Sequence, residues 1–201
     1  MSTALIFPVG HYLGANHPGG EHLVRIGWRQ CALGAGDELA VWALAHGVPG
    51  RSGEAPWTRT SIEAVAQAGG ITRPAATIDQ LLERDLLIEV TPGTADAVEF
   101  ARACRIGSLL VGSGVQPNGD YGLGAVPANP SAGVDGFAYE LWTWGHAFDS
   151  LWDACELFAS TEADSGEASA QDVLDRVLPA TQQLLAGGAA YLDESREPLP
   201  A

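Results

Sequence analysis

The chain has 201 residues, 46% of them hydrophobic and 17% charged, with a formal net charge of −15 and no lysine. This composition supplies a packed core and excludes a disordered chain. No apolar run approaches the roughly 18 residues that a membrane span needs. The apolar start, "MSTALIFPVGHYLG", contains a proline and no basic residue before it, which fits a first strand better than a secretory signal.

Cysteine number and arginine use indicate a compartment and an origin. Cys31, Cys104 and Cys155 are odd in number and widely spaced, which argues against a disulfide framework and for a reducing interior. Ten arginines without lysine, in a chain rich in Ala and Gly, are typical of a GC-rich genome. We therefore expect a cytoplasmic, bacterial protein without membrane contacts.

Acidic residues are concentrated in the second half. Residues 1–110 contain eight arginines and eleven acidic residues, a net charge of −3. Residues 111–201 contain two arginines and fourteen acidic residues, a net charge of −12. The field of this half repels a polyanion and favours a basic partner.

The first half begins with two predicted strands, residues 4–9 and 22–28, separated by the turn residues "GANHPGG". A helix follows over 37–47, where Asp37 is suited to cap the start and Gly47 to end the helix. Its apolar residues occupy nearly every side, which is typical of a buried helix.

Two further helices and a strand follow. Thr60 and Glu63 have the spacing of a capping box for the second helix, which Gly69 and Gly70 end. The third helix, over 73–86, is expected to be capped by Thr72. Residues 88–90 then follow the period of a strand. The inward face of the third helix is predicted to consist of Ala75, Ile78, Leu81, Leu82 and Leu86.

This order of elements resembles the winged helix-turn-helix superfamily over residues 4–92. The segment "LLERDLLIEV" is similar to the Leu-Leu-x-x-Gly-Leu-Leu pattern that often ends the third helix, with Asp85 in place of the glycine. Strands before the helices more narrowly resemble the leader-peptide recognition domains of peptide-modifying systems, including the small peptide chaperone of pyrroloquinoline quinone biosynthesis. The resemblance implies a fold and leaves the partner open, because the superfamily includes DNA readers, peptide binders and scaffolds.

The second half is predicted to be mainly helical. A helix begins near residue 95, and the Gly/Pro/Asn-rich residues 114–136 read as a hairpin plus loop. Two helical pieces separated near Gly145 follow, and a last helix begins at Ser169. The sequence thus predicts an α+β protein, with a winged-helix region over 1–92 and an acidic, mainly helical region with a Gly-rich hairpin over 93–201. The second region packs either on the first or on another subunit.

The predicted third helix carries a polar stripe opposite its apolar face. At about 100° per residue its members fall within roughly 40° of one another. Arg59 is a further cation nearby, whereas Asp79 and Glu83 lie on the same exposed side. Arg and Gln suit the edges of guanine and adenine, so the stripe suits DNA reading, a protein or peptide partner, or an ordinary solvated surface. The stripe consists of Arg73, Thr77, Gln80 and Arg84.

Histidines and tryptophans are the other candidate site residues. His11, His17 and His22 lie within twelve residues, but in a flexible turn without the fixed spacing of zinc motifs, so we expect no metal site. A spacing of two places Trp142 and Trp144 on different sides of a helix, so one of them should lie near the surface. These two and Trp152 are candidates for an interface.

No catalytic motif is apparent: the chain has no Gly-Lys-Ser/Thr loop, no Gly-x-Ser-x-Gly and no His-Glu-x-x-His. We therefore expect no catalytic residues and no cofactor. The leading hypothesis is a non-enzymatic winged-helix protein that binds a protein or peptide as a regulator or adaptor. This hypothesis allows the chain to form a homodimer. The alternative is a DNA-binding transcription regulator that reads with residues 73–86, and a third is an enzyme with its site between the two halves.

Overall fold

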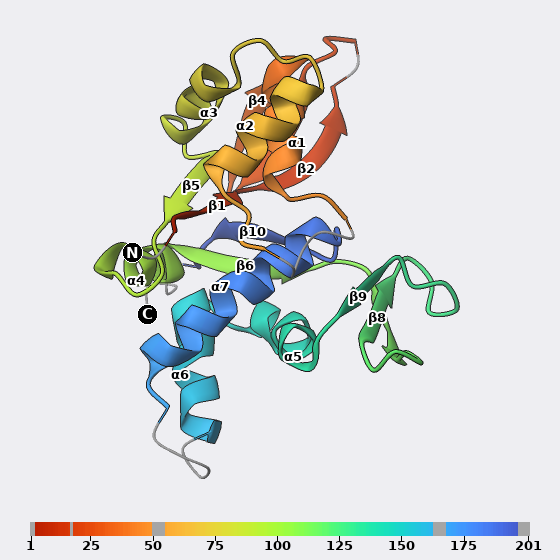
Figure 1. Cartoon of the computed structure of the whole chain (residues 1–201), viewed down its shortest axis with the longest axis vertical. Coiled ribbons are helices and arrows are strands. Elements are labelled where there is room, and N and C mark those ends of the chain that lie inside the picture. The colour runs from red at the N-terminus through yellow and green to blue at the C-terminus, as the bar shows by residue number, and fades with distance from the viewer. Residues whose placement is uncertain (1–2, 17, 50–54, 163–167, 197–201) are drawn as a thin grey trace.

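The computed structural model describes residues 3–16, 18–49, 55–162 and 168–196 (Figure 1). Within these residues the chain forms helices and small antiparallel sheets, so the predicted α+β class is confirmed. None of the described helices is long and apolar enough to cross a membrane.

The first half contains two sheets and three helices. β2, β3 and β4 form an antiparallel sheet in that order, and β1 pairs with β5. α1 packs against both α2 and α3. The elements are β1 (Leu5–Pro8), β2 (His11–Ala15), β3 (His22–Ile26), β4 (Arg29–Leu33), α1 (Asp37–Ala45), α2 (Arg59–Ala68), α3 (Pro74–Leu82) and β5 (Leu87–Val90).

The first forty residues form four strands, whereas the sequence indicated two. β2 and β4 were missed because most of their side chains are exposed, which removes the apolar alternation. The predicted strand over 22–28 ends at Ile26, because Gly27 and Trp28 form the tight turn to β4 and Gly27 has φ +54°.

The start of α3 and the turn after it differ in part from expectation. The helix begins at Pro74, and Arg73 precedes it without a side-chain cap, so Thr72 does not cap it. Ile78, Leu81 and Leu86 are buried as predicted, whereas Ala75 is exposed. Asp85 adopts φ +56°, the left-handed conformation that favours glycine.

The cap of α2 lies two residues earlier than predicted. Thr58 and Ser61 form a capping box, in which the Thr58 hydroxyl accepts from the Ser61 N–H at 3.2 Å. We expect Thr58→Ala to lower the free energy of unfolding by about 1 kcal/mol, the usual cost of losing an N-cap. Thr60→Ala, at the sequence-predicted cap, serves as the control and should change it by under about 0.5 kcal/mol. Urea denaturation measures both, and equal effects would contradict this assignment.

The second half surrounds a long central helix. α7 contacts α4, α5 and α6, and the last strand, β10, pairs with β6. β10 was not predicted. The elements are α4 (Ala95–Ala103), β6 (Cys104–Ser108), β7 (Val111–Val115), β8 (Tyr121–Gly124), β9 (Ala132–Val134), α5 (Gly136–Trp144), the 3-10 helix η1 (Gly145–Ala147), α6 (Leu151–Glu162), α7 (Ala170–Ala186) and β10 (Ala190–Glu194).

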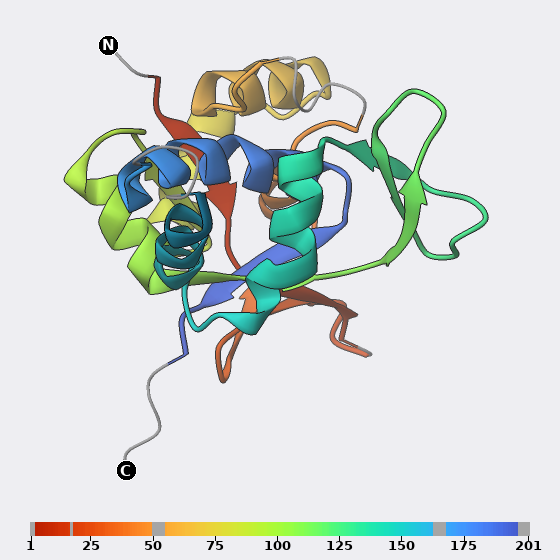
Figure 2. The same cartoon turned by 90° about the horizontal axis from the view of Figure 1, so that it is seen from below.

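The predicted Gly-rich hairpin is confirmed as part of a three-stranded sheet, β7–β8–β9. This sheet extends to one side of the molecule in both views (Figures 1 and 2). Ser169 caps α7 through a capping box with Asp172, as the sequence indicated for this helix start.

Buried side chains form two apolar clusters, and β1 contributes to both. Leu5 and Phe7 belong to the cluster that contains α4, α5, α6 and α7. Ile6, between them, belongs to the cluster that contains α1, α2 and α3. Because side chains alternate along a strand, this one strand connects the two clusters.

Candidate functional site

The predicted polar stripe is brought to the surface of α3. Arg73, Gln80 and Arg84 are exposed, and Thr77 is half-buried, with its hydroxyl donating to the Arg73 carbonyl at 3.2 Å. The stripe therefore exists as a surface feature. Its cations differ in what they contact.

Arg59 is held by two carboxylates. Its Nε donates to Glu63 at 2.9 Å, and its guanidinium donates to Asp79 at 2.7 Å. These hydrogen bonds, with that to Glu63 as the largest cause, raise the pKa of Arg59 above its usual value. Arg59 thus connects α2 to α3.

Arg84 connects three elements. Its guanidinium forms an ion pair with Glu38 in the first turn of α1, and it donates to the Ala32 carbonyl of β4 at 2.5 Å. One side chain therefore spans the end of the α3 segment, the start of α1 and the middle of β4. Of the Arg59, Arg73 and Arg84 side chains, only that of Arg73 forms no hydrogen bond or ion pair with the described residues.

The outer edge of β4 has no strand neighbour in the described structure, since β4 is the last strand of its sheet. In an antiparallel ladder, residues alternate between those that bond to the neighbouring strand and those whose N–H and C=O point away. Ile26 and Arg29 flank the two-residue turn, which places the backbone groups of Gln30 and Ala32 on the outer edge. The Arg84 contact with the Ala32 carbonyl agrees with this assignment.

Partly buried apolar residues occur in β4 and in the segments that Arg84 joins to it. Cys31, Leu39 and Leu82 are only partly buried against the core, and each adjoins or lies close in sequence to a residue of the Arg84 contacts. Trp28, at the turn that begins β4, is fully exposed, with a relative accessibility of 104%. Large exposed apolar groups beside an open strand edge are typical of recognition surfaces.

The turn that carries Trp28 is held in place by the buried carboxylate of Asp193. Asp193 of β10 is 0% exposed and accepts from the Gly27 N–H at 2.7 Å. It also pairs with Arg25 at 3.2 Å and with Arg105 at 2.8 Å. This network fixes the β3–β4 turn to the second half of the chain.

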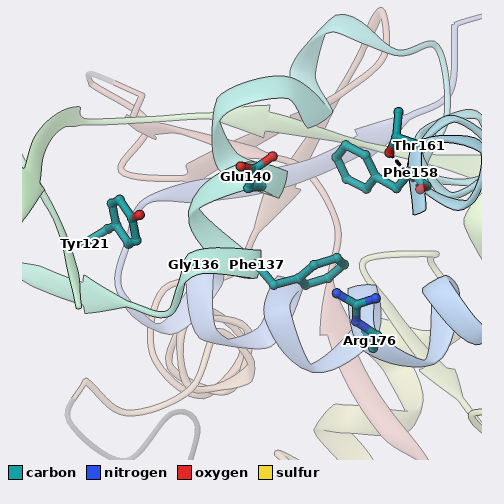
Figure 3. A pocket seen from close by; sticks show the side chains of 7 residues that line it. All are labelled: Tyr121, Gly136, Phe137, Glu140, Phe158, Thr161 and Arg176. Atoms are coloured by element: carbon teal, nitrogen blue, oxygen red, sulfur yellow. Dashed lines mark hydrogen bonds between the residues drawn. The ribbon is translucent and has the colours of Figure 1, made fainter. Parts of the chain in front are cut away.

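Two adjoining hollows lie between α5 and α6, with volumes of about 320 Å³ and 230 Å³. They share Glu140, Phe158 and Thr161. Figure 3 shows the first hollow, whose lining comes from β8, α5, α6 and α7 and whose Arg176 guanidinium lies 4.1 Å from the Phe137 ring centre. The second is lined in addition by Trp144, Ala147, Phe148 and Leu157.

Of the three tryptophan candidates, Trp144 is the exposed one. Trp142 is half-buried and donates to the Leu109 carbonyl at 2.8 Å, whereas 57% of Trp144 is exposed, so the expectation that one of the pair lies near the surface is confirmed. Trp152 donates to Glu156 at 2.7 Å and packs under Arg102. Of the three, Trp144 is the one that lines either of the two hollows described above.

His11 and His22 each interact with a tyrosine and not with each other. His11 stacks on Tyr191, and the ring nitrogen of His22 lies 2.7 Å from the Tyr12 hydroxyl; His17 lies outside the described residues. No group of three or more His, Cys, Asp or Glu within the described part of the chain is placed to hold a metal ion.

Two of the cysteines are buried thiols with raised pKa values. Burial raises the pKa of Cys104 from 9.0 to about 12, and the charges of Asp193 and Glu194 add to this. Burial likewise raises the pKa of Cys155 to about 12, and Glu156 adds to this. Neither thiol is therefore activated as a nucleophile.

These pKa values predict which thiol reacts. In the native protein at pH 8 we expect Ellman's reagent to label one cysteine per chain, Cys31, which is partly exposed, and all three after unfolding. Mass spectrometry of labelled peptides identifies the site, and rapid native labelling of Cys104 or Cys155 would contradict their burial.

The raised pKa values of Cys104 and Cys155 also predict that the free energy of unfolding falls as pH rises from 9 towards 12. These thiols ionise at a lower pH in the unfolded chain than in the folded one.

Comparison of the chain with models of protein families, with curated protein sequences and with solved structures found no match. The residues around the β4 edge and in the α5–α6 hollows are therefore the basis for the function proposed below. Sequence reasoning identified Arg84 and Trp144 but missed Gln30, Glu140 and Asp193, because their roles depend on residues far away in the chain.

Proposed function

We propose that this chain is a non-enzymatic binding protein that captures an extended segment of a partner protein along the outer edge of β4, beside α3, as a regulator or adaptor. The observation that supports this most directly is the open edge at Gln30 and Ala32, where, among the described residues, Arg84 alone forms a hydrogen bond with the outward backbone groups. An added strand would gain main-chain hydrogen bonds there, and alternate side chains would meet Leu39 and Leu82.

The proposal includes the winged-helix assignment. Three helices followed by β5, with strands before them, are similar to that superfamily and to its leader-peptide recognition members. In those proteins an extended peptide adds to a strand edge beside the third helix. In this chain the hydrogen bond from Arg84, two residues after α3, to the Ala32 carbonyl of β4 is the observation that supports the comparison.

DNA reading has weaker support. Arg59 and Arg84 already contact carboxylates, so neutralising phosphate would require breaking those pairs. Of these three candidate arginines, Arg73 alone remains without a carboxylate contact among the described residues, and the protein has a net charge of −15. Affinity for DNA comes mainly from several simultaneous phosphate contacts. The arrangement thus favours a peptide, and the acidity of the chain favours a basic one.

The test uses the backbone of β4. Random linear 12-residue peptides displayed on phage are selected against the full chain, and the affinities of selected peptides are measured by isothermal titration calorimetry. Gln30→Pro removes an outward N–H that β3 does not use, and proline is tolerated at such edge positions. We expect Gln30→Pro to weaken binding about tenfold, the value of one hydrogen bond of roughly 1.4 kcal/mol.

Gln30→Ala is the matched control, because it changes the side chain and keeps the N–H. It should bind with nearly unchanged affinity, and urea denaturation should show both variants folded. Equal affinity of wild type and Gln30→Pro, or failure to select any peptide, would overturn the proposed edge. Salt-sensitive, sequence-selective binding to genomic DNA fragments that Arg73→Ala removes would favour the DNA-reading alternative.

A further inference from the structure

A second surface, distant from β4, has the form of a docking groove. α5 and α6 lie in the lower half of the molecule in Figure 1, whereas β4 lies in the upper half. The two hollows between these helices adjoin at Glu140, Phe158 and Thr161. They form one continuous groove, which we call the α5–α6 groove.

The second hollow of this groove is largely apolar, whereas the first combines aromatic rings with the charged side chains of Glu140 and Arg176. Phe137 and Phe158 lie in the first hollow, and 57% of Trp144 and 46% of Leu157 are exposed at the second. Small-ligand pockets usually measure about 300–1,000 Å³, so each hollow is at or below the lower end of that range. Each hollow taken singly has room for individual side chains of a partner.

Glu140 stands between the two hollows. It is exposed, and no hydrogen bond or ion pair is recorded for it within the described residues. The half of the chain that carries it has a net charge of −12. A partner that places a cation between two apolar side chains would match the groove in both charge and polarity.

We propose that the α5–α6 groove binds an amphipathic helix of a partner protein that presents Lys or Arg to Glu140 and apolar side chains to the two hollows. A groove between two helices accepts a third helix through side chains at i, i+3 or i+4, and i+7. This site does not depend on the β4 edge. Together the two surfaces would let the protein join two partners.

The probes are two labelled 18-residue synthetic peptides of Leu and Lys, or of Leu and Glu, patterned as amphipathic helices. Fluorescence anisotropy with the full chain at about 0.15 M salt should detect binding of the Lys peptide and at least tenfold weaker binding of the Glu peptide. Glu140→Lys and Leu157→Ser should each weaken binding of the Lys peptide at least tenfold. Leu157 is exposed enough for its substitution to be tolerated.

Glu83→Lys is the charge-matched control, because Glu83 is exposed at the end of α3, away from the groove. It should leave binding within about twofold. Equal weakening by Glu83→Lys and Glu140→Lys, or no effect of Glu140→Lys and Leu157→Ser, would reduce the interaction to non-specific attraction and overturn the site. Absence of binding would overturn it as well. The Gln30→Pro variant should bind the Lys peptide with the affinity of the wild type. The experiments therefore test this site and the β4 edge separately.

Discussion

Replacing Asp193 with alanine is expected to lower the free energy of unfolding by about 3 kcal/mol. Its side chain is 0% exposed and holds the Gly27 N–H, Arg25 and Arg105 at 2.7, 3.2 and 2.8 Å. Breaking a buried ion pair from one side typically costs about 3–5 kcal/mol. Since the arginine side chains are 32% and 16% exposed, water compensates in part, and we expect the low end of that range.

Urea denaturation followed by circular dichroism measures this change. Asp193→Asn is the control, because the amide oxygen still accepts from Gly27 while the charge is lost. Its effect should lie between those of wild type and Asp193→Ala. A loss of less than about 1 kcal/mol in Asp193→Ala would show that the network contributes little to the fold.

Phe7→Ala is expected to have the largest effect, a loss of about 4 kcal/mol. Phe7 is fully buried, and its ring stacks on Phe100 with centroids 5.0 Å apart. Removing a buried aromatic ring costs both transfer free energy and a cavity, together about 3–5 kcal/mol. Phe7 also lies on the strand that contributes to both apolar clusters.

The same denaturation experiment applies to this variant. Phe7→Leu keeps most of the apolar volume and should cost under about 1.5 kcal/mol. Near-equal losses for the two substitutions would indicate that the site collapses readily around a smaller residue. They would contradict the tight packing of the Phe7 ring, in β1, against Phe100 of α4.

Local patterns predicted the helices better than the strands. The third helix and the last helix carry clear apolar faces, and Ser169 begins α7 as its cap type indicates. β2 and β4 were not predicted because they are exposed edge strands. Such strands lack the alternation of apolar and polar residues by which a strand is recognised in a sequence. β10 pairs with β6 across more than eighty residues of chain, a distance over which local sequence carries no information.

The candidate site shows the same limit. Arg73, Gln80 and Arg84 are exposed, but the helix predicted over 73–86 covers only Pro74–Leu82, so Arg73 and Arg84 lie just outside it. The contacts of Arg84 with Glu38 and Ala32 span 46 and 52 residues. These contacts weaken the DNA-reading alternative and direct attention to the outer edge of β4 as the place where a peptide partner would bind. Glu140 offered no pattern in the sequence, since its significance comes from Phe158 and Leu157 on the neighbouring helix.

The position of Asp193 also bears on how the protein is made. Arg25 and Asp193 are 168 residues apart, so the β3–β4 turn leaves the ribosome long before its anchor is synthesised. At about 5–20 residues per second, this interval lasts roughly ten to thirty seconds. During that time the turn with Trp28 can form between β3 and β4, but the Asp193 carboxylate that accepts from the Gly27 N–H has not yet been synthesised. The surface that we assign to partner recognition is therefore among the last parts of the molecule to mature during translation.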